Sequence, residues 1–297
     1  MYPWCMNHRI GLAAAFVTAR VLAGPTFTVS FDASVRPEPA TGRLLVYLVR
    51  EGSGINEPPS AGPFWENPQP IFGINVNGLK PGESATIDDS ATAFGRPIGR
   101  LEPGSYRVQA VLDVNQDNSD WKREPGNLFS DTLTVKIDQG SVAIPLTRKV
   151  GPRRLPQAPG LEWFEVRSTL LSDFHHRDIV LRAGVALPVG YDPAAERRYA
   201  AVYEVPGFGG DHLGAAPIAN ARKMFNGESP DARLARSTFW IVLDPESGNG
   251  HTLFADSANN GPRGEALVKE LIPALEAKYR LVKEPGARLL RGHSSGG

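Results

Sequence analysis

The sequence predicts two domains of different fold class, an all-β sandwich of the immunoglobulin type followed by an α/β domain with a mostly parallel sheet. Three observations lead to this expectation. Short alternating segments separated by turn residues fill the first half, a proline-rich stretch follows them, and strands then alternate with helical patterns. The 31 glycines and 26 prolines among 297 residues also exclude a helical bundle or coiled coil.

Charge and cysteine content narrow the possible functions. Lys plus Arg and Asp plus Glu both number 32, so the formal net charge is zero, whereas nucleic-acid binding requires a basic excess. Cys5 is the single cysteine, which excludes a disulfide framework and a cysteine-based metal site. No apolar run approaches the ~20 residues of a membrane-spanning helix.

The N-terminus predicts export. An apolar run at residues 10–19 follows Arg9, and Val17-Thr18-Ala19 and Val21-Leu22-Ala23 each have the small-residue pattern of a signal-peptidase site. We therefore expect residues 1–23 to be a signal peptide and the protein to be secreted or periplasmic. The alternative is a disordered leader or a helix lying on the domain.

Residues 25–150 are expected to form the sandwich. Apolar and polar residues alternate in four segments, and turn dipeptides such as Pro-Gly and Gln-Gly separate them. The segments are residues 26–31, 43–49, 105–112 and 132–137.

One polar loop of this domain has a calcium-loop spacing. Its potential ligands stand at positions 1, 3, 5, 7 and 12, with Asn118 in place of the usual glycine: Asp113, Asn115, Asp117, Ser119 and Glu124. Because a strand rather than a helix precedes the loop, a polar hairpin is the favoured interpretation, and no metal site is predicted.

Residues 151–160 are proline-rich, lack apolar periodicity and are expected to be the linker. Residues 161–297 then follow the α/β pattern. A strand pair is expected over residues 163–187 with a turn near residues 175–178, and further strands at 199–205, 238–243 and 287–291. Apolar residues recur every fourth position from Leu267 to Tyr279 and predict a helix, which Pro273 should kink.

The last six residues carry the strongest chemical signal. Gly292-His293-Ser294-Ser295-Gly296-Gly297 follows an apolar strand and contains the Gly-x-Ser-x-Gly pattern of a nucleophile elbow. A serine at such a sharp strand-to-helix turn has a strained backbone, and glycines two residues away avoid collisions with neighbouring segments. Ser294 is therefore the candidate nucleophile, and an incidental glycine-rich turn is the alternative.

A second glycine-rich turn, Pro206-Gly207-Phe208-Gly209-Gly210, directly follows the strand at 199–205. Such a turn can direct a backbone N–H at a developing oxyanion. The amides of Phe208 and Ser295 are the candidate donors. A flexible loop without a role is the alternative.

These segments resemble the esterase branch of the α/β-hydrolases that includes feruloyl esterases, enterochelin esterases and mycolyltransferases. The resemblance covers residues 163–297 and rests on the segment from Tyr203 to Gly210, the Asp256-to-Pro262 segment, the helix around Pro273 and the elbow. It implies an α/β-hydrolase fold, hydrolysis of carboxylic esters, Ser294 as nucleophile and Phe208 and Ser295 as oxyanion donors. It implies no cofactor.

The sequence departs from this family after Ser294. The family places the acid and the histidine after the nucleophile, but only three residues follow here. We therefore interpret the chain as an incomplete hydrolase domain whose triad is missing two members. Upstream histidines and aspartates do not fit the family's chain order, and His212, His251 and Asp256 are candidates for lining the substrate site instead. The residues considered for the missing roles are His175, His176, His212, His251, His293, Asp173, Asp178, Asp211, Asp244 and Asp256.

The predicted function is a serine hydrolase that acts on a small or polysaccharide-linked ester through an acyl-enzyme. Two alternatives remain open. An acyltransferase or peptidase would use the same elbow. A non-catalytic protein with a vestigial hydrolase half could instead bind carbohydrate or a partner through the sandwich. The sequence does not indicate the specific ester or the oligomeric state.

Overall fold

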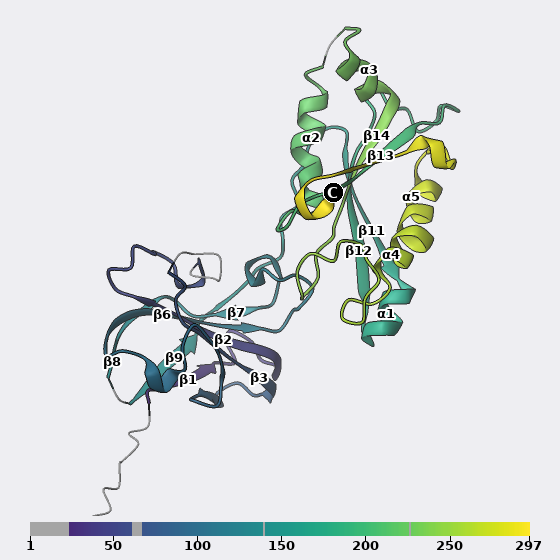
Figure 1. Cartoon of the computed structure of the whole chain (residues 1–297). Coiled ribbons are helices and arrows are strands. Elements are labelled where there is room, and N and C mark those ends of the chain that lie inside the picture. Colours follow the sequence, from purple (N-terminus) through teal and green to yellow (C-terminus); the bar gives the residue numbers. More distant parts are fainter. Residues whose placement is uncertain (1–23, 61–66, 139, 226) are drawn as a thin grey trace, which may run out of the picture.

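The computed structural model describes residues 24–297 except 61–66, 139 and 226, and shows a β-rich half joined to an α/β half (Figure 1). The predicted signal peptide at residues 1–23 lies outside the described residues. No described helix has the length and apolar character needed to cross a membrane.

The first half consists of two sheets. One has the strand order β4-β1-β9, and the other has the order β10-β7-β6-β2-β3-β5 with β8 also paired to β6. Its strands are β1 (Thr26–Phe31), β2 (Ala40–Arg50), β3 (Ile71–Leu79), β4 (Ser84–Ile87), β5 (Thr92–Phe94), β6 (Gly104–Asp113), β7 (Leu128–Phe129), β8 (Leu133–Ile137), β9 (Ser141–Leu146) and β10 (Arg148–Lys149). Short 3₁₀ turns are η1 (Pro58–Ser60), η2 (Ile98–Arg100) and η3 (Trp121–Arg123).

The two sheets share one hydrophobic core because each turns an apolar face inward. In β1 every second residue is buried, and Phe27 stacks on Phe72 of the other sheet with 6.2 Å between ring centroids. The four predicted strand segments are confirmed as β1, β2, β6 and β8. The immunoglobulin type remains a prediction.

The second half is built on one five-stranded sheet with the order β11-β12-β14-β13-β15. Its strands are β11 (Leu161–Ser168), β12 (Ile179–Ala186), β13 (Ala200–Val205), β14 (Thr238–Leu243) and β15 (Arg288–Gly292). Its helices are α1 (Thr169–His175), α2 (Ala215–Arg222), α3 (Pro230–Ser237), α4 (Arg263–Ala266) and α5 (Ile272–Lys278), with the shorter turns η4 (His212–Gly214), η6 (Pro285–Ala287) and η7 (Ser294–Gly296). Helices α2 and α3 lie on one side of the sheet and α1, α4 and α5 on the other (Figure 1).

The expectation of a mostly parallel sheet is correct only for three strands. β13 pairs in parallel with β14 and β15, whereas the pairs β11–β12 and β12–β14 are antiparallel. The short connection between β11 and β12 explains the first antiparallel pair, because parallel neighbours need a crossover of a dozen or more residues. That connection contains helix α1, where only a turn was predicted.

Two local features explain the helices at this side of the sheet. The Ser168 hydroxyl caps α1 by accepting a hydrogen bond from Leu171 N at 3.1 Å, and His176 ends it in the left-handed conformation with φ 53°. Before Pro273, where a kink was predicted, the helix widens into a π-helical segment, η5 (Leu267–Leu271). Proline has no N–H to donate and its ring crowds the preceding turn, so a wider turn accommodates it.

Candidate active site

Three loops meet at one edge of the second sheet. Strands β14, β13 and β15 lie side by side and run parallel, so the segments that follow them leave the sheet at the same edge. These segments begin at Asp244, Pro206 and His293. All of the sequence-predicted site residues come from these loops or from the turns next to them.

Ser294 lies at a sharp turn between β15 and the 3₁₀ turn η7, with an exposed side chain and a φ of 54°. A positive φ is uncommon for a residue with a β-carbon and is found where the surroundings enforce it. The flanking glycines show this enforcement. A Cβ on Gly292 would stand 1.8 Å from Gly296 O, and a Cβ on Gly296 would stand 2.1 Å from Val205 O. The turn therefore requires glycine at both positions.

The glycine-rich turn after β13 packs directly against Ser294. A Cβ built on Gly207 would lie 3.3 Å from Ser294 Cβ and 3.1 Å from His293 O. Gly210 N donates to Gly207 O at 2.9 Å, and Gly209 has a φ of 76°, as a tight turn with a left-handed third residue requires. Phe208 stands between these glycines with an exposed ring. The structure thus brings the loop of Phe208 next to Ser294.

Ser295 is the second residue of η7. Amides in the first turn of a helix have no intrahelical acceptor, so the Ser295 amide belongs to the group that can bind an anion at this end. The Ser295 hydroxyl oxygen is buried and has no partner among the described residues.

His251 forms a hydrogen bond with the loop that contains Phe208, and it is not free to act as a base. Its Nε2 lies 2.8 Å from Pro206 O, and its Nδ1 lies 3.1 Å from Leu253 N. A carbonyl can only accept and an amide can only donate, so these partners assign the neutral ring with the proton on Nε2. Both ring nitrogens are therefore engaged.

His212, a candidate for lining the substrate site, is buried. Only 3 % of the residue is exposed, its Nδ1 lies 2.7 Å from Asp244 Oδ2, and the ring packs edge-on to Trp163. Burial by itself raises the pKa of Asp244, but the hydrogen bond and charge of His212 outweigh it and the net pKa is lowered. The sequence does hold a signal for this pair, because both residues follow neighbouring parallel strands.

Asp256 makes a structural contact. Its Oδ1 accepts hydrogen bonds from Gly264 N at 2.8 Å and Glu265 N at 3.1 Å, so it caps the start of α4. The Asp256-to-Pro262 segment is closed by reciprocal bonds between Ser257 and Gly261. This segment positions a helix at the edge of the site.

Among the described residues, no imidazole or carboxylate makes a hydrogen bond with Ser294 Oγ. His175 contacts Asn260 O at 3.3 Å, His176 is the left-handed cap of α1, and His293 is the immediate neighbour of Ser294. The described chain thus supplies the turn and the candidate donors but brings no base to the serine.

The β-rich half holds the glycine-rich loop from outside, which the sequence did not reveal. Arg123 Nη1 donates to Gly209 O at 2.8 Å and lies 3.1 Å from Asp211 Oδ2, and Arg153 of the linker also pairs with Asp211. Asp211 Oδ1 in turn accepts from Leu213 N at 2.8 Å and caps η4. One buried carboxylate therefore joins both halves to the loop that contains Phe208.

The side chains with calcium-loop spacing do not converge. Asp117 pairs with Arg177 at 2.5 Å, and Asn115 donates to Pro125 O at 3.2 Å. Ser119 donates to Glu246 of the second half at 3.4 Å. Within the described ranges, no three His, Cys, Asp or Glu residues are placed to hold a metal ion.

No family model matches this sequence, and no curated protein matches it. Among solved structures, a ferulic acid esterase is similar with 17% identity and a TM-score of 0.33, over 46% of this chain and 51% of that chain. An S-formylglutathione hydrolase from Agrobacterium tumefaciens shows 16% identity and a TM-score of 0.33, over 48% of this chain and 52% of that chain. The CE1 ferulic acid esterase from Anaeromyces mucronatus shows 17% identity and a TM-score of 0.27, over 48% of this chain and 53% of that chain.

These neighbours are two ferulic acid esterases and an S-formylglutathione hydrolase, and this chain spans about half the length of each.

Proposed function

We propose that the chain is the nucleophile-bearing part of a serine hydrolase that cleaves carboxylic esters. The observation that supports this most is the backbone of Ser294, held at a positive φ between two glycines that tolerate no β-carbon. Strain of this kind is maintained at functional sites. The adjoining loop of Phe208 supplies the second element that acyl transfer requires, a set of backbone donors.

In the proposed reaction, Ser294 Oγ attacks the ester carbonyl carbon and its proton passes to a histidine base. The carbonyl oxygen becomes an oxyanion that the amides of Phe208 and Ser295 stabilise. The carbonyl then re-forms, the alcohol leaves with the proton, and water releases the acid from the acyl-enzyme. Following the family resemblance, we place the histidine and its acid after Gly297 in a longer protein, and the ester can be small or linked to a polysaccharide. No step requires a cofactor.

A cysteine at position 294 tests the oxyanion site without a base, because a thiolate attacks esters unaided. We would prepare Ser294→Cys in a Cys5→Ser background and follow stoichiometric acylation by 4-nitrophenyl acetate. The matched control is Ser257→Cys, an exposed serine in the loop after β14. Rates are compared per thiolate, after the pKa of each thiol has been titrated.

We expect the position-294 thiolate to react about 10²-fold faster than the control, since single oxyanion donors contribute 10²–10³ in rate. Adding Gly296→Ala should remove most of this advantage, because the new Cβ displaces the turn. Equal rates per thiolate at the two positions would show that no oxyanion site faces residue 294.

A further inference from the structure

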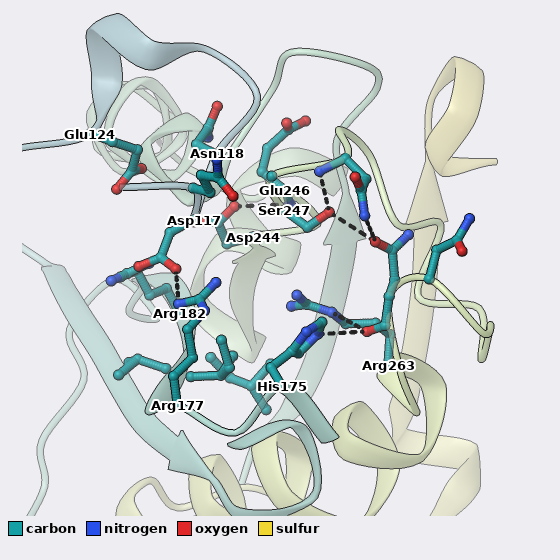
Figure 2. A pocket seen from close by; sticks show the side chains of 18 of the residues that line it. Asp117, Asn118, Glu124, His175, Arg177, Arg182, Asp244, Glu246, Ser247 and Arg263 are labelled. Atoms are coloured by element: carbon teal, nitrogen blue, oxygen red, sulfur yellow. Dashed lines mark hydrogen bonds and ion pairs between the residues drawn. The ribbon is translucent and has the colours of Figure 1, made fainter. Parts of the chain in front are cut away.

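A polar cavity of about 400 Å³ lies between the two halves of the molecule. The β-rich half contributes residues of the loop after β6, and the α/β half contributes β12 and the loop after β14 (Figure 2). This volume is within the range of small-molecule sites, and the lining is charged or amidic rather than apolar. The cavity is separate from the Ser294 turn, none of whose residues line it.

On the wall formed by the β-rich half, Glu124 is buried without a partner. The residue is 7 % exposed, and its carboxylate makes no hydrogen bond or ion pair with any described residue. Burial raises its pKa to about 7, although the charge of Arg182 opposes the shift. A buried carboxylate with no donor is costly, so a donor from a ligand would be stabilising here.

Glu246, in the loop after β14 of the α/β half, adds a second carboxyl group to the cavity lining. It is also 7 % exposed, its Oε1 is buried without a hydrogen-bond partner, and its Oε2 accepts a 3.4 Å bond from Ser119. Desolvation and the nearby Asp244 both raise its pKa. Two nearly buried carboxyl groups therefore line one cavity, and each has at least one oxygen without a donor from the described residues.

On the opposite wall, Arg263 is a buried cation without a carboxylate. The residue is 7 % exposed, its Nε donates to Asn260 O at 3.2 Å, and it forms no ion pair with a described residue. Figure 2 shows Arg263 and Glu124 on opposite sides of the cavity. Burial lowers the pKa of Arg263, as expected for a guanidinium that has lost its water.

Three other charges around the cavity have ionic partners. Arg177 pairs with Asp117, and Asp244 pairs with His212. Arg182 Nε donates to Glu165 at 3.0 Å. Glu124 and Arg263 are thus two lining charges of opposite sign that form no ion pair with a described residue, and they stand on walls that belong to different halves of the chain.

We propose that this cavity binds a small zwitterion of dipeptide size, with its ammonium group at Glu124 and its carboxylate at Arg263. An ammonium group offers three donors to the acidic wall, and a carboxylate can accept two parallel bonds from a guanidinium. The amide side chains of Asn249 and Asn259, which also line the cavity, suit the peptide group between the charged ends. A neutral sugar would leave both charges uncompensated, and a cation alone would leave Arg263 unpaired.

This inference does not depend on the chemistry of Ser294, and binding to the full chain tests it directly. The probes are dipeptides with neutral, acidic and basic side chains, represented by L-alanyl-L-alanine, and their counterparts blocked by N-acetylation and C-amidation. Isothermal titration calorimetry in two buffers of different ionisation heat measures affinity and proton release. We expect at least one free dipeptide to bind with release of a proton near pH 7, because the ammonium group favours the ionised form of Glu124.

Blocking both ends of that dipeptide should abolish binding. Glu124→Gln and Arg263→Gln should each weaken it tenfold or more, whereas Glu38→Gln, at an exposed glutamate of the β-rich half, should leave it unchanged. If Arg263→Gln does not fold, the blocked peptides and the Glu124→Gln variant still test whether the cavity recognises the charged ends of a dipeptide. The proposal is overturned if no free dipeptide binds at tens of millimolar, if blocked and free peptides bind equally, or if maltose binds instead.

Discussion

Removing the carboxylate of Asp211 should destabilise the protein by about 3 kcal/mol, because this one group serves three donors. It is nearly buried, caps η4 through Leu213 N, and receives guanidinium groups from Arg123 and Arg153. Loss of an N-cap costs about 1 kcal/mol. Breaking a buried ion pair costs roughly 3–5 kcal/mol of unfolding free energy. The side chains of Arg123 and Arg153 are 33% and 22% exposed and regain water when Asp211 is removed, so we expect about half of that cost, about 2 kcal/mol, in addition to the lost cap.

Asp211→Asn separates these contributions. The asparagine amide oxygen can still cap η4, but the negative charge is lost. We therefore expect the free energy of unfolding to fall by about 2 kcal/mol in Asp211→Asn and by about 3 kcal/mol in Asp211→Ala. The assay is urea unfolding at pH 7.5 followed by tryptophan fluorescence, because Trp163 packs against His212 just beyond this contact. An Asp211→Ala effect below about 0.5 kcal/mol would refute the reasoning. So would an Asn variant as unstable as the Ala variant.

Three further predictions concern the turn, the cavity and the domain boundary. Gly296→Ala should cost about 1–3 kcal/mol of unfolding free energy in thermal denaturation, because its Cβ would stand 2.1 Å from Val205 O, and an unchanged Tm would contradict the turn geometry. The raised pKa of Glu124, about 7, favours the protonated folded state, so stability is greatest below the unfolded pKa of about 4.3 and falls as pH rises to about 7. That fall amounts to roughly 2.5 kcal/mol of unfolding free energy between pH 5 and 7.5, and Glu124→Gln should flatten it in urea titrations because the other charges that act on Glu124, those of Arg182, Asp117, Arg153 and Asp244, are unchanged. A variant whose pH profile runs parallel to that of the wild type would contradict this prediction. Residues 24–150 should unfold cooperatively by calorimetry when expressed alone, since their hydrophobic core contains no residue of the second half, and the absence of a transition would refute the boundary.

Local patterns account for what the sequence predicted well. The alternation in residues 26–31 matches β1, and the apolar run at 238–243 matches β14. A strand that is buried on one face alternates apolar and polar residues, and a strand that is buried on both faces is continuously apolar, so successive residues suffice to predict both. The apolar spacing from Leu267 to Tyr279 likewise predicted the helical region, and Pro273 marked its irregularity. Helix α1 was missed because its seven residues are too few to establish a period.

Contacts between distant segments could not be predicted. Arg123 and Asp211 are separated by 88 positions, and no short-range pattern marks either residue as a partner. The burial of His212 could not be predicted for the same reason, since it depends on contacts with Trp163 and Asp244, which come from other segments. The Gly-x-Ser-x-Gly pattern, in contrast, could locate the turn, because its steric requirement is local to five residues.

The salt bridges at Asp211 couple the relative position of the two halves to the conformation of the loop around Phe208. Arg123 also binds the carbonyl of Gly209, so the position of the β-rich half and the shape of the loop around Phe208 are not independent variables. Any ligand that favours one relative orientation of the halves must then change the free energy of that loop, and a ligand bound at the loop must bias the orientation by the same amount. The contacts of Arg123 and Arg153 with Asp211 thus tie the placement of the N-terminal half to the geometry of the loop around Phe208.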